Sequence, residues 1–529
     1  MPQASPARVA ALGLIAALNI SPMVTLAQSQ QGQGVPPTPS FVIRGFDIAG
    51  DNPLPQDETT RVLAPFLRTD ATIDTLQRAT AALEAALKGR GYGLHRVALP
   101  PQEVGAKVTL NVVKFVIGKV MIEGVSRLSE SNIRASLPEL AEGTAPNLQA
   151  LARQAAMANE NEGKKVQVSL KESDAADRID VKIVVKEERP WSVTSALSNT
   201  GSDATGKDRL TLVGTYSNLF DRDHQLAAAY TTSVEQLRGV RQLGLSYRAP
   251  LYTIGGIVGL SATHSNVVGN FGAFSSTGAG QTVTVSYSHY LLPVGGRRSY
   301  LTANLDDKRF DTGRVNGIDV PGQLMRRSRP LTLGYSARVE SDAAILAYNI
   351  DLAVNLPGGL GNNVGAYQSE DARIGTVRWK ALRGGGSYLS FFGSGWLWGI
   401  RGQFQYSPDA LISGEQFGLG GAASVRGTAE RPLAGDSGLQ ASTELSSPEL
   451  RTGLRVTGFV DAGWLTNHNP NGNPKPASDH LTSVGLGLRY TVGSYGVTAD
   501  WARIVRGSVI PLLPQAGDQK VHLNVSARF

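Results

Sequence analysis

The chain has 529 residues, of which 41% are apolar and 18% are charged, and it has no cysteine. This composition can bury large cores, and it excludes a disordered protein, a disulfide scaffold, thiolate metal sites and cysteine catalysis. The net charge of +7 is spread thinly, because residues 41–189 are neutral and residues 190–529 hold 30 basic and 24 acidic side chains; we therefore expect no nucleic-acid partner.

Residues 1–27 have the parts of a secretory signal peptide. Arg8 provides a basic start and Val9–Ile20 an apolar run. Thr25-Leu26-Ala27 then places small residues before a cleavage site at Gln28. The apolar run is shorter than the roughly 20 residues of a membrane span, and no other such run follows, which excludes a helical multi-span protein. A buried N-terminal helix is the alternative.

Residues 28–40 are rich in Gln, Gly and Pro. We expect them to form a flexible tether. They are too few and too poor in helix formers for both a helix of about 30 Å and a linker.

A short motif occurs twice: residues 46–50 (FDIAG) are echoed by residues 120–124 (VMIEG). Each is expected to be a strand that ends in Gly and is followed by two helices and two strands. Two α/β domains are therefore expected, over residues 41–117 and 118–189. The expected helices are Pro55–Leu67, Ile73–Arg90, Ser129–Leu137 and Asn147–Asn161, and the expected later strands are Leu94–Leu99, Lys107–Val116, Lys165–Lys171 and Arg178–Lys186.

This β-α-α-β-β order, twice in tandem, resembles the POTRA domain. The resemblance implies periplasmic modules that bind client polypeptides along exposed strand edges. Such binding is physically reasonable, because the unpaired backbone groups of an edge accept an extended segment with little demand on its sequence. The alternative is that the two modules are generic α/β spacers.

From residue 190 onward, segments of about ten residues alternate between apolar and polar positions, with turn-forming clusters between them. They predict sixteen strands. These are Trp191–Asn199, Arg209–Asn218, His224–Ser233, Val240–Arg248, Gly255–Thr263, Thr282–Tyr290, Ser299–Arg309, Leu331–Val339, Ala344–Leu356, Arg373–Leu382, Trp396–Tyr406, Gly438–Ser446, Arg455–Leu465, Leu481–Thr491, Tyr495–Ile504 and Lys520–Phe529.

The connections between these strands alternate in length. Short ones, such as 219–223 and 492–494, follow even-numbered strands, and most long ones, such as 310–330, follow odd-numbered strands. This alternation and the even strand count are typical of a sixteen-stranded antiparallel transmembrane β-barrel with short periplasmic turns and long outer loops. A soluble β-sandwich or propeller is the alternative.

The last expected strand is amphipathic along its whole length. Its odd positions from Val521 to Phe529 are apolar and its even positions polar, which suits lipid on one face and a wet lumen on the other. The terminal aromatic, Phe529, resembles the signal read by the outer-membrane insertion machinery. All six Trp residues follow residue 190, and we expect them in girdles at the membrane interfaces.

The longest connection, residues 411–437, contains Ser424-Val425-Arg426-Gly427, and the thirteenth strand contains Gly458-Phe459-Val460-Asp461-Ala462-Gly463. Asp461 shares a face with Phe459 and Gly463, opposite an apolar face, so it should point into the lumen. A carboxylate beneath a folded-in loop needs a cationic partner. Arg426 can supply a bidentate one, and the flanking Gly lets the backbone approach. The alternative is a hydrated Asp461 and an exposed Arg426.

The two motifs look like the V-R-G-[Y/F] loop tip and the F-x-D-x-G strand of the POTRA-plus-barrel transporter superfamily. With two α/β repeats, sixteen strands and this length, the chain resembles the two-partner secretion branch, which exports haemolysins and filamentous haemagglutinins. The resemblance implies that the sixth outer loop folds into the lumen. There Arg426 would lock to Asp461 on the wall, and Phe529 would serve outer-membrane targeting. The supporting motif residues would be Val425, Gly427, Phe459 and Gly463.

The resemblance also implies a place in the outer membrane of a Gram-negative bacterium, with the POTRA domains in the periplasm. The expected function is export of a large unfolded protein that carries an N-terminal secretion domain. The other expected partners are outer-membrane lipid or lipopolysaccharide and, during biogenesis, the barrel-assembly machinery. We expect no enzyme activity, catalytic residue, cofactor or metal. A barrel-assembly insertase is the alternative function, and a passive porin is disfavoured because porins lack POTRA domains.

Three further features have less weight. Thr428 stands where the family usually has an aromatic residue, so a less tightly packed tip is expected. Residues 435–438 (GDSG) resemble a serine-protease motif, but the histidines lack a supporting context. Residues 326–329 (RRSR) lie in an expected outer loop, where contact with lipopolysaccharide and a solvated charge run are equally plausible.

Overall fold

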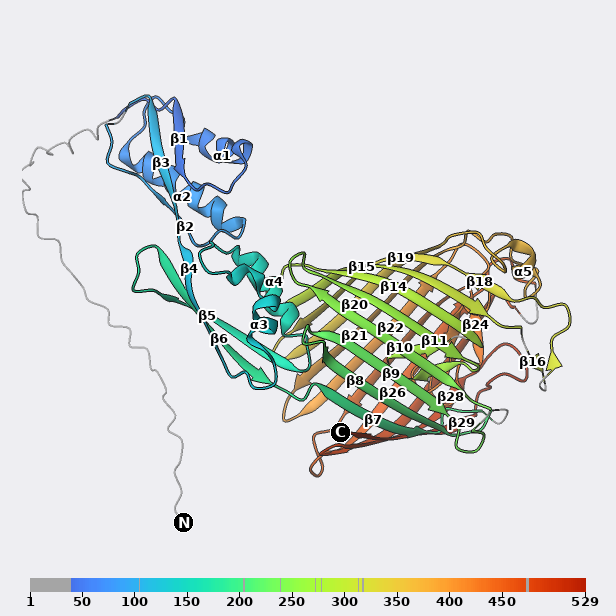
Figure 1. Ribbon diagram of the computed structural model, residues 1–529. Coiled ribbons are helices and arrows are strands. Elements are labelled where there is room, and N and C mark those ends of the chain that lie inside the picture. The colour runs from blue at the N-terminus through green and yellow to red at the C-terminus, as the bar shows by residue number, and fades with distance from the viewer. Residues whose placement is uncertain are drawn as a thin grey trace, which may run out of the picture.

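The computed structural model describes residues 40–529 apart from 104, 203–204, 238, 272, 277, 313, 316–317 and 472–474. Two small α/β units stand outside one end of a large β-barrel (Figure 1). The expected signal peptide, residues 1–27, and all of the expected tether except Ser40 lie outside the described residues. Within the described part of the chain, no helix is long and apolar enough to cross a membrane.

The first unit has the expected order of elements. They are β1 (Gly45–Gly50), α1 (Gln56–Leu63), the 3-10 turn η1 (Ala64–Phe66), α2 (Ile73–Gly89), β2 (His95–Ala98) and β3 (Lys107–Lys114). Strand β3 is central, parallel to β1 and antiparallel to β2. The apolar stripe of α2, which includes Leu76 and Leu83, is buried in one core with Val108 and Leu110 of β3, as its helical periodicity predicts.

The second unit repeats this plan. Its elements are β4 (Val116–Glu123), α3 (Glu130–Ser136), η2 (Pro138–Leu140), α4 (Leu148–Ala158), β5 (Lys164–Glu172) and β6 (Arg178–Glu187). Strand β6 is central, parallel to β4 and antiparallel to β5. Strand β5 therefore has a neighbour on one side only and forms an edge of the three-stranded sheet.

Two glycines explain why the same motif occurs in both units. Gly50 is the last residue of β1 and Gly124 directly follows β4, with φ angles of +80° and +86°. A Cβ atom at these positions would lie 2.3 Å and 2.1 Å from the backbone oxygens of Val112 and Val185 in the central strands. Glycine is required at both places, because any side chain would collide with the sheet and strain the backbone.

After residue 190 the chain forms a closed antiparallel barrel, in which β29 pairs with β7. Strands β18 and β19 pair with consecutive parts of β15 and together count as one strand of the wall, interrupted at Arg329. The prediction of sixteen strands after two α/β units is therefore confirmed. The barrel strands are β7 (Trp191–Ser198), β8 (Arg209–Leu219), β9 (His224–Thr232), β10 (Gln242–Leu251), β11 (Gly256–Ser265), β14 (Gly280–Tyr290), β15 (Arg297–Phe310), β18 (Arg326–Ser328), β19 (Pro330–Glu340), β20 (Ala344–Asn355), β21 (Lys380–Phe392), β22 (Trp396–Tyr406), β25 (Ser437–Ser446), β26 (Leu454–Thr466), β27 (Ser478–Val492), β28 (Tyr495–Arg506) and β29 (Gln519–Arg528).

Further short elements lie in the longer connections. They are the hairpins β12 (Gly269–Phe271) with β13 (Phe274–Ser276), β16 (Arg314–Val315) with β17 (Ile318–Asp319) and β23 (Phe417–Leu419) with β24 (Leu433–Gly435), and the helix α5 (Val364–Gln368). Of these, β16 and α5 are seen at the end away from the α/β units (Figure 1). The turns at the opposite end are short, such as 220–223 and 493–494. This is the length asymmetry expected from the sequence.

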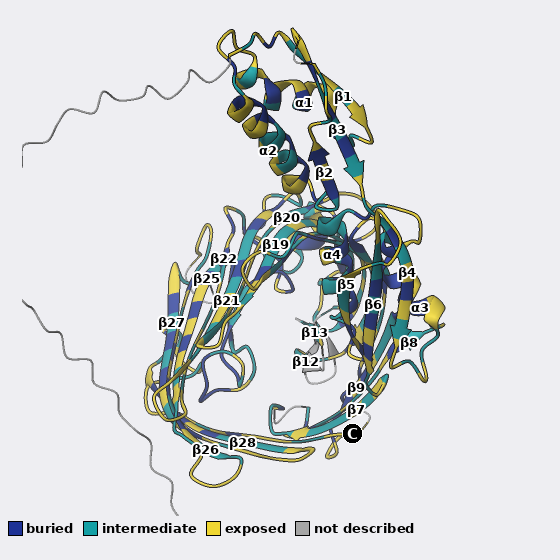
Figure 2. Ribbon diagram, turned by 90° about the vertical axis from the view of Figure 1, so that its left-hand side faces the viewer, coloured by how far each residue is buried: buried dark blue, intermediate teal, exposed yellow. Residues whose placement is uncertain are grey.

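The barrel strands alternate between an apolar outer face and an inner face. In β29, for example, Val521, Leu523 and Val525 are exposed, whereas His522 between them is buried. Figure 2, a view into the barrel coloured by burial, shows exposed residues interspersed with intermediate and buried ones along the wall strands. An apolar exterior is the surface that a lipid-facing wall requires.

One expected strand was wrong. The tenth was placed at Arg373–Leu382, but β21 runs over Lys380–Phe392. The alternating apolar residues before Lys380 belong to an outer loop, where Ile374 and Trp379 are buried with Tyr367 and Phe310. Trp379 is therefore buried away from lipid and cannot belong to an interfacial girdle, whereas the five other Trp residues are exposed and the girdle stays a prediction for them.

The RRSR segment was also misplaced. It was expected in an outer loop, but Arg326–Ser328 forms β18 within the barrel wall. Arg326 is buried and pairs with Glu370 at 3.1 Å. Arg327 forms an ion pair with Asp307. Both arginines form ion pairs within the chain, so the segment is not a run of solvated charges.

Glu187, at the end of β6, holds the turn that follows β4. Its carboxylate accepts hydrogen bonds from the backbone N–H groups of Ser126 (2.7 Å), Arg127 (3.0 Å) and Leu128 (2.9 Å) and from the Ser126 hydroxyl (2.7 Å). Partial burial alone would raise the pKa of Glu187. The donors favour the ionised carboxylate and lower the pKa to about 2.

Replacing Glu187 by Gln should therefore loosen this turn by about 2 kcal/mol, the typical value of hydrogen bonds to a charged group. Because the folded pKa is depressed, the stabilisation is complete above the ordinary value of 4.5 and is lost as pH falls through about 2. Hydrogen exchange of amides 126–128 should be faster in Glu187→Gln at neutral pH, and the difference should shrink towards pH 2. Glu188→Gln, which removes only a surface partner of Lys186, is the control. Equal protection in both variants would contradict the assignment.

Candidate functional site

The connection between β22 and β25, residues 407–436, folds back inside the barrel. Its stem is the antiparallel hairpin of β23 and β24, and its tip is residues 424–428. Leu419, Val425 and Leu433 of this connection form one buried cluster with Leu465, Leu481 and Ile504 of the wall. The tip reaches the middle of the wall, because it contacts Asp461, which lies halfway along β26.

Arg426, in the tip, forms a bidentate ion pair with Asp461. Its Nη2 and Nε atoms lie 2.8 Å from Oδ1 and Oδ2 of Asp461. The backbone N–H of Arg426 donates a third hydrogen bond to Oδ2, at 3.1 Å. The two side chains are 1% and 0% exposed, so the pair is shielded from water and its geometry has the strength of a charge-assisted bidentate contact.

Two further carboxylates face the same guanidinium. Nη1 of Arg426 lies 2.7 Å from Glu444 of β25 and 3.3 Å from Asp500 of β28. Arg401 pairs with Glu444 and Arg489 with Asp500, so three arginines balance three acids. Sequence reasoning found one acid and missed the other two. The sequence signal for Glu444 and Asp500 was their register, because both occupy inward positions, on β25 next to β26 and on the nearby strand β28.

The guanidinium of Arg426 stacks on the ring of Phe459. The guanidinium carbon lies 3.3 Å from the ring centroid, a cation–π contact that binds the cation without adding a charge. Gly463, farther along β26, leaves room for the stem: a Cβ there would lie 2.5 Å from Leu419. Both expected motif residues on β26 therefore touch the loop.

The rest of the tip is closely held. Gly427 has φ +100° and donates its N–H to Nε2 of His522 on β29 at 3.1 Å, which requires that Nε2 carry no proton. Thr428 is buried, and its hydroxyl accepts a hydrogen bond from Gly421 at 3.0 Å and donates one to Ala429 at 2.9 Å. Thr428 is thus held by hydrogen bonds in place of aromatic packing, and the looser tip stays a prediction.

The stem is anchored separately, towards the outer end of the barrel. Asp436 pairs with Arg373 at 2.9 Å and accepts a backbone hydrogen bond from Leu411, also at 2.9 Å. Glu415 pairs with Lys308 at 3.1 Å and with Arg383 at 2.9 Å. The GDSG segment is thus part of an ion-pair anchor.

Within the part of the chain that the structure describes, no group of three or more potential ligands is placed to hold a metal ion.

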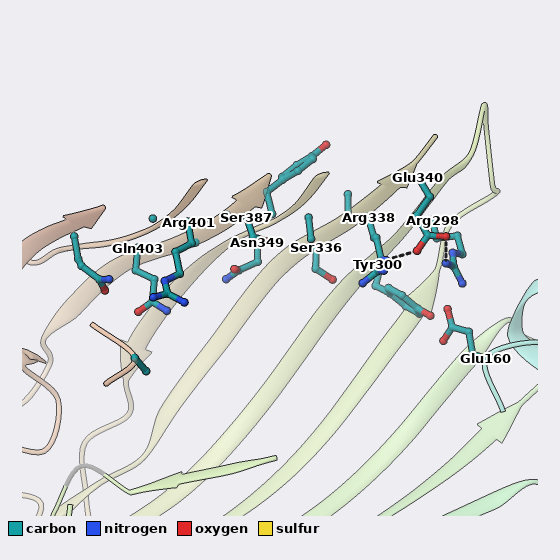
Figure 3. Close-up of a pocket in the computed structure, with 18 of the residues that line it drawn as sticks. Glu160, Arg298, Tyr300, Ser336, Arg338, Glu340, Asn349, Ser387, Arg401 and Gln403 are labelled. Atoms are coloured by element: carbon teal, nitrogen blue, oxygen red, sulfur yellow. Dashed lines mark hydrogen bonds and ion pairs between the residues drawn. The ribbon is translucent and has the colours of Figure 1, made fainter. Parts of the chain in front are cut away.

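A polar cavity of about 810 Å³ lies in the lumen between the second unit and the loop tip; we call it the vestibule. One end is formed by Asn159, Glu160 and Lys165 of the second unit and the other by Ala423, next to the tip. Figure 3 shows Glu160 facing Tyr300 and the side chains of several wall strands lined up beside it. Apart from Arg401, the wall residues between them on β20–β22 are small or uncharged, including Ala347, Asn349, Gly385, Gly386, Ser387, Gly402 and Gln403.

Phe529 lies directly after β29. Its backbone still exchanges hydrogen bonds with Val193 of β7, at 2.9 and 3.1 Å, and its ring contacts Tyr495 edge-on. The residue is exposed on the side of the apolar face. This position extends the seam between β29 and β7 by one residue pair.

Comparisons with known proteins agree with this architecture. Residues 41–114 match the model of the ShlB-type POTRA domain. The outer membrane transporter CdiB of Escherichia coli is 23% identical over 490 residues, which cover 90% of this chain and 81% of that protein. CdiB of Dickeya dadantii (strain 3937) is 22% identical over 480 residues, which cover 88% and 83%.

Solved structures have the same fold. CdiB from Escherichia coli superposes with a TM-score of 0.71 at 20% identity, covering 95% of this chain and 93% of that one. CdiB from Acinetobacter baumannii gives 0.69 at 16% identity, covering 93% and 90%.

More than half of the chain, residues 177–490, matches the model of the haemolysin secretion/activation protein ShlB/FhaC/HecB family. The match, together with the POTRA units and the closed barrel, confirms the function and location expected from the sequence. The chain belongs to this family of outer-membrane transporters of two-partner secretion, with its POTRA domains in the periplasm.

Proposed function

We propose that this transporter exports a large secreted protein as an unfolded chain, and that the Arg426–Asp461 pair locks the sixth outer loop in the lumen on which export depends. The observation that carries the proposal is the buried tip above an open polar vestibule. The vestibule volume of about 810 Å³ is in the range of small-molecule pockets, a size that suits an extended polypeptide segment rather than a folded domain. Folding of the client outside the cell would give the direction, without nucleotide, cofactor or enzyme activity.

The edge of β5 is a suitable capture site for the client. Val166 donates its N–H away from β6, to Oδ1 of Asn159 at 2.6 Å. Backbone groups alternate in direction along a strand, so the N–H groups of Val168 and Leu170 also point away from the sheet. Lys165, next to this edge, lines the vestibule. An extended client segment that pairs with β5 would therefore be directed towards the lumen.

The remaining parts of the proposal concern delivery of the transporter itself. Residues 1–27 would be removed as a signal peptide, and the barrel-assembly machinery would read Phe529 during insertion. The exposed apolar wall would contact outer-membrane lipid, and the outer loops lipopolysaccharide. The family assignment favours export over barrel assembly. A large secreted protein encoded beside this transporter would be its expected client, recognised through an N-terminal secretion domain.

Arg426→Ala and Asp461→Ala should each reduce export at least tenfold, because breaking a buried pair costs about 3–5 kcal/mol. Arg426→Ala leaves Asp461 without its cation, and Asp461→Ala removes the bidentate partner of Arg426. The double variant should be little worse than either single one, since the two side chains act as a unit. The measurement is client secretion at matched outer-membrane levels, with heat-modifiable gel mobility as the test of barrel folding. Arg451→Ala, in an exposed inner turn, is the control. Additive losses, or normal export by Arg426→Ala, would refute the lock.

Leu170→Pro should weaken client binding about three- to tenfold, the value of one lost hydrogen bond. Proline removes the outward N–H of an edge strand and keeps the ladder with β6. Leu170→Ala is the matched control, because it loses the same exposed side chain but keeps the N–H. Binding of the client's N-terminal region to the full transporter, measured by titration, should separate the two variants. Equal affinities would remove β5 as the capture edge.

A further inference from the structure

The second unit contains a lysine that is completely buried. Lys164, the first residue of β5, is 0% exposed. Its Nζ atom lies 2.7 Å from Oδ2 of Asp223, which is 2% exposed. It also donates hydrogen bonds to Asn132 at 2.7 Å and Ser136 at 3.2 Å. Burial lowers the pKa of Lys164, and the charge of Asp223 opposes that effect.

Asp223 belongs to the barrel, in the turn between β8 and β9. The turn is tightly wound, with positive φ angles at Phe220, Asp221 and Asp223. Tyr252, in the next inner turn, donates its hydroxyl to Oδ2 of Asp223 at 2.7 Å. Asn132 of α3 donates to Oδ1 of Asp223 at 3.2 Å. One carboxylate thus joins two barrel turns to a helix and a strand of the second unit.

The apolar core of the second unit continues across this contact. Tyr252 and Tyr290 of the barrel rim are buried in one cluster with Ile133, Met157 and other core residues of the second unit. Figure 2 shows α4, β5 and β6 beside β8 and β9, on the opposite side of the mouth from β21, β22 and β25. Mobile interdomain contacts are usually smaller and more polar than a shared core of this kind.

The contact between the two α/β units is different. Asn147 donates to the backbone oxygen of Arg90, Gln149 to that of Gly89, and the N–H of Leu148 to that of Gly91. The two units have separate apolar cores. Only Phe115 separates β3 from β4. Hydrogen bonds near solvent are cheaply exchanged for water, so this is the softer joint of the periplasmic arm.

We propose that Lys164 and Asp223 form a docking pair that holds the second POTRA unit against the barrel throughout export, so that the arm bends between its two units. The inference rests on the proposed function, because it makes the start of β5 a fixed entrance to the vestibule. Undocking would separate a buried ammonium from a buried carboxylate, and an uncompensated buried charge is among the costliest defects in a protein.

A disulfide across the docked contact tests the proposal. An ideal Cβ on Gly163 lies 2.7 Å from Oγ of Ser217 in β8, close to the geometry that a disulfide needs. The chain has no cysteine, so Gly163→Cys with Ser217→Cys would create a single defined cross-link. The oxidised transporter should export within about twofold of its reduced form and of each single cysteine variant, because a joint that stays closed loses nothing when it is bonded. Blocked export that a reductant restores would overturn the proposal.

The docking pair itself is tested by rescue. Lys164→Met should lower export by about tenfold or more, because it leaves Asp223 buried without its cation. Adding the Gly163–Ser217 cross-link to Lys164→Met should restore export if Lys164 acts by docking. Normal export by Lys164→Met, or a defect that persists after cross-linking, would overturn this role.

The unaltered transporter separates the two hypotheses. If it exports no client, the proposed function fails. If it exports while the oxidised cross-linked form does not, only the fixed docking fails. Lys186→Met, in the neighbouring strand β6, is the matched control for Lys164→Met, because Lys186 is exposed and pairs with Glu188 at the surface rather than with a buried carboxylate.

Discussion

The charge of Arg426 must be neutralised inside the barrel, and this requirement determines how the lumen is built. A guanidinium that is 1% exposed has lost nearly all of its water, so protein groups have to replace it. Three strands each supply one carboxylate, as Glu444, Asp461 and Asp500. Withdrawing the tip would leave Asp461 without a cation, while Glu444 and Asp500 would keep Arg401 and Arg489 as partners. The position of the loop is thus set by inward-facing acids of three wall strands, β25, β26 and β28.

The tip and the stem of the sixth outer loop are held by different ion pairs, so each can be displaced without the other. The stem is fixed by Asp436 and Glu415, both nearly buried and both paired with arginine. None of these contacts involves Arg426 or its carboxylates. Loss of the tip contacts therefore leaves the stem attached to the outer end of the barrel. Only the short segment between β23 and β24 has to move for the lumen to change its shape, while the outer loops stay assembled.

The strand pattern of the barrel was predictable because a single physical rule, an apolar exterior and a ladder with period two, applies to every strand. The rule failed where its premise failed. Residues 373–382 also alternate, but Ile374 and Trp379 face a loop core instead of lipid. The Arg426–Asp461 contact followed from a motif and a register. Glu444, Asp500 and His522 did not, because an inward polar residue is ordinary in a wet lumen and only the folded loop makes three of them converge. Lys164 and Asp223 carried no signal at all, since each is one charge among many.

These ion pairs supply what the strand ladder cannot. Closing the barrel satisfies the backbone of every strand, but it gives no reason for a loop or a periplasmic unit to take one place. An apolar contact would hold such an element with little preference for its register. A buried pair is more selective, because any displacement leaves two desolvated charges without partners, even where the net stabilisation is small. Lys164 at the periplasmic mouth, Arg426 at mid-height and Arg373 at the outer end each pair with an acid from another element. The three levels are thereby positioned independently, so a change at one level need not disturb the other two.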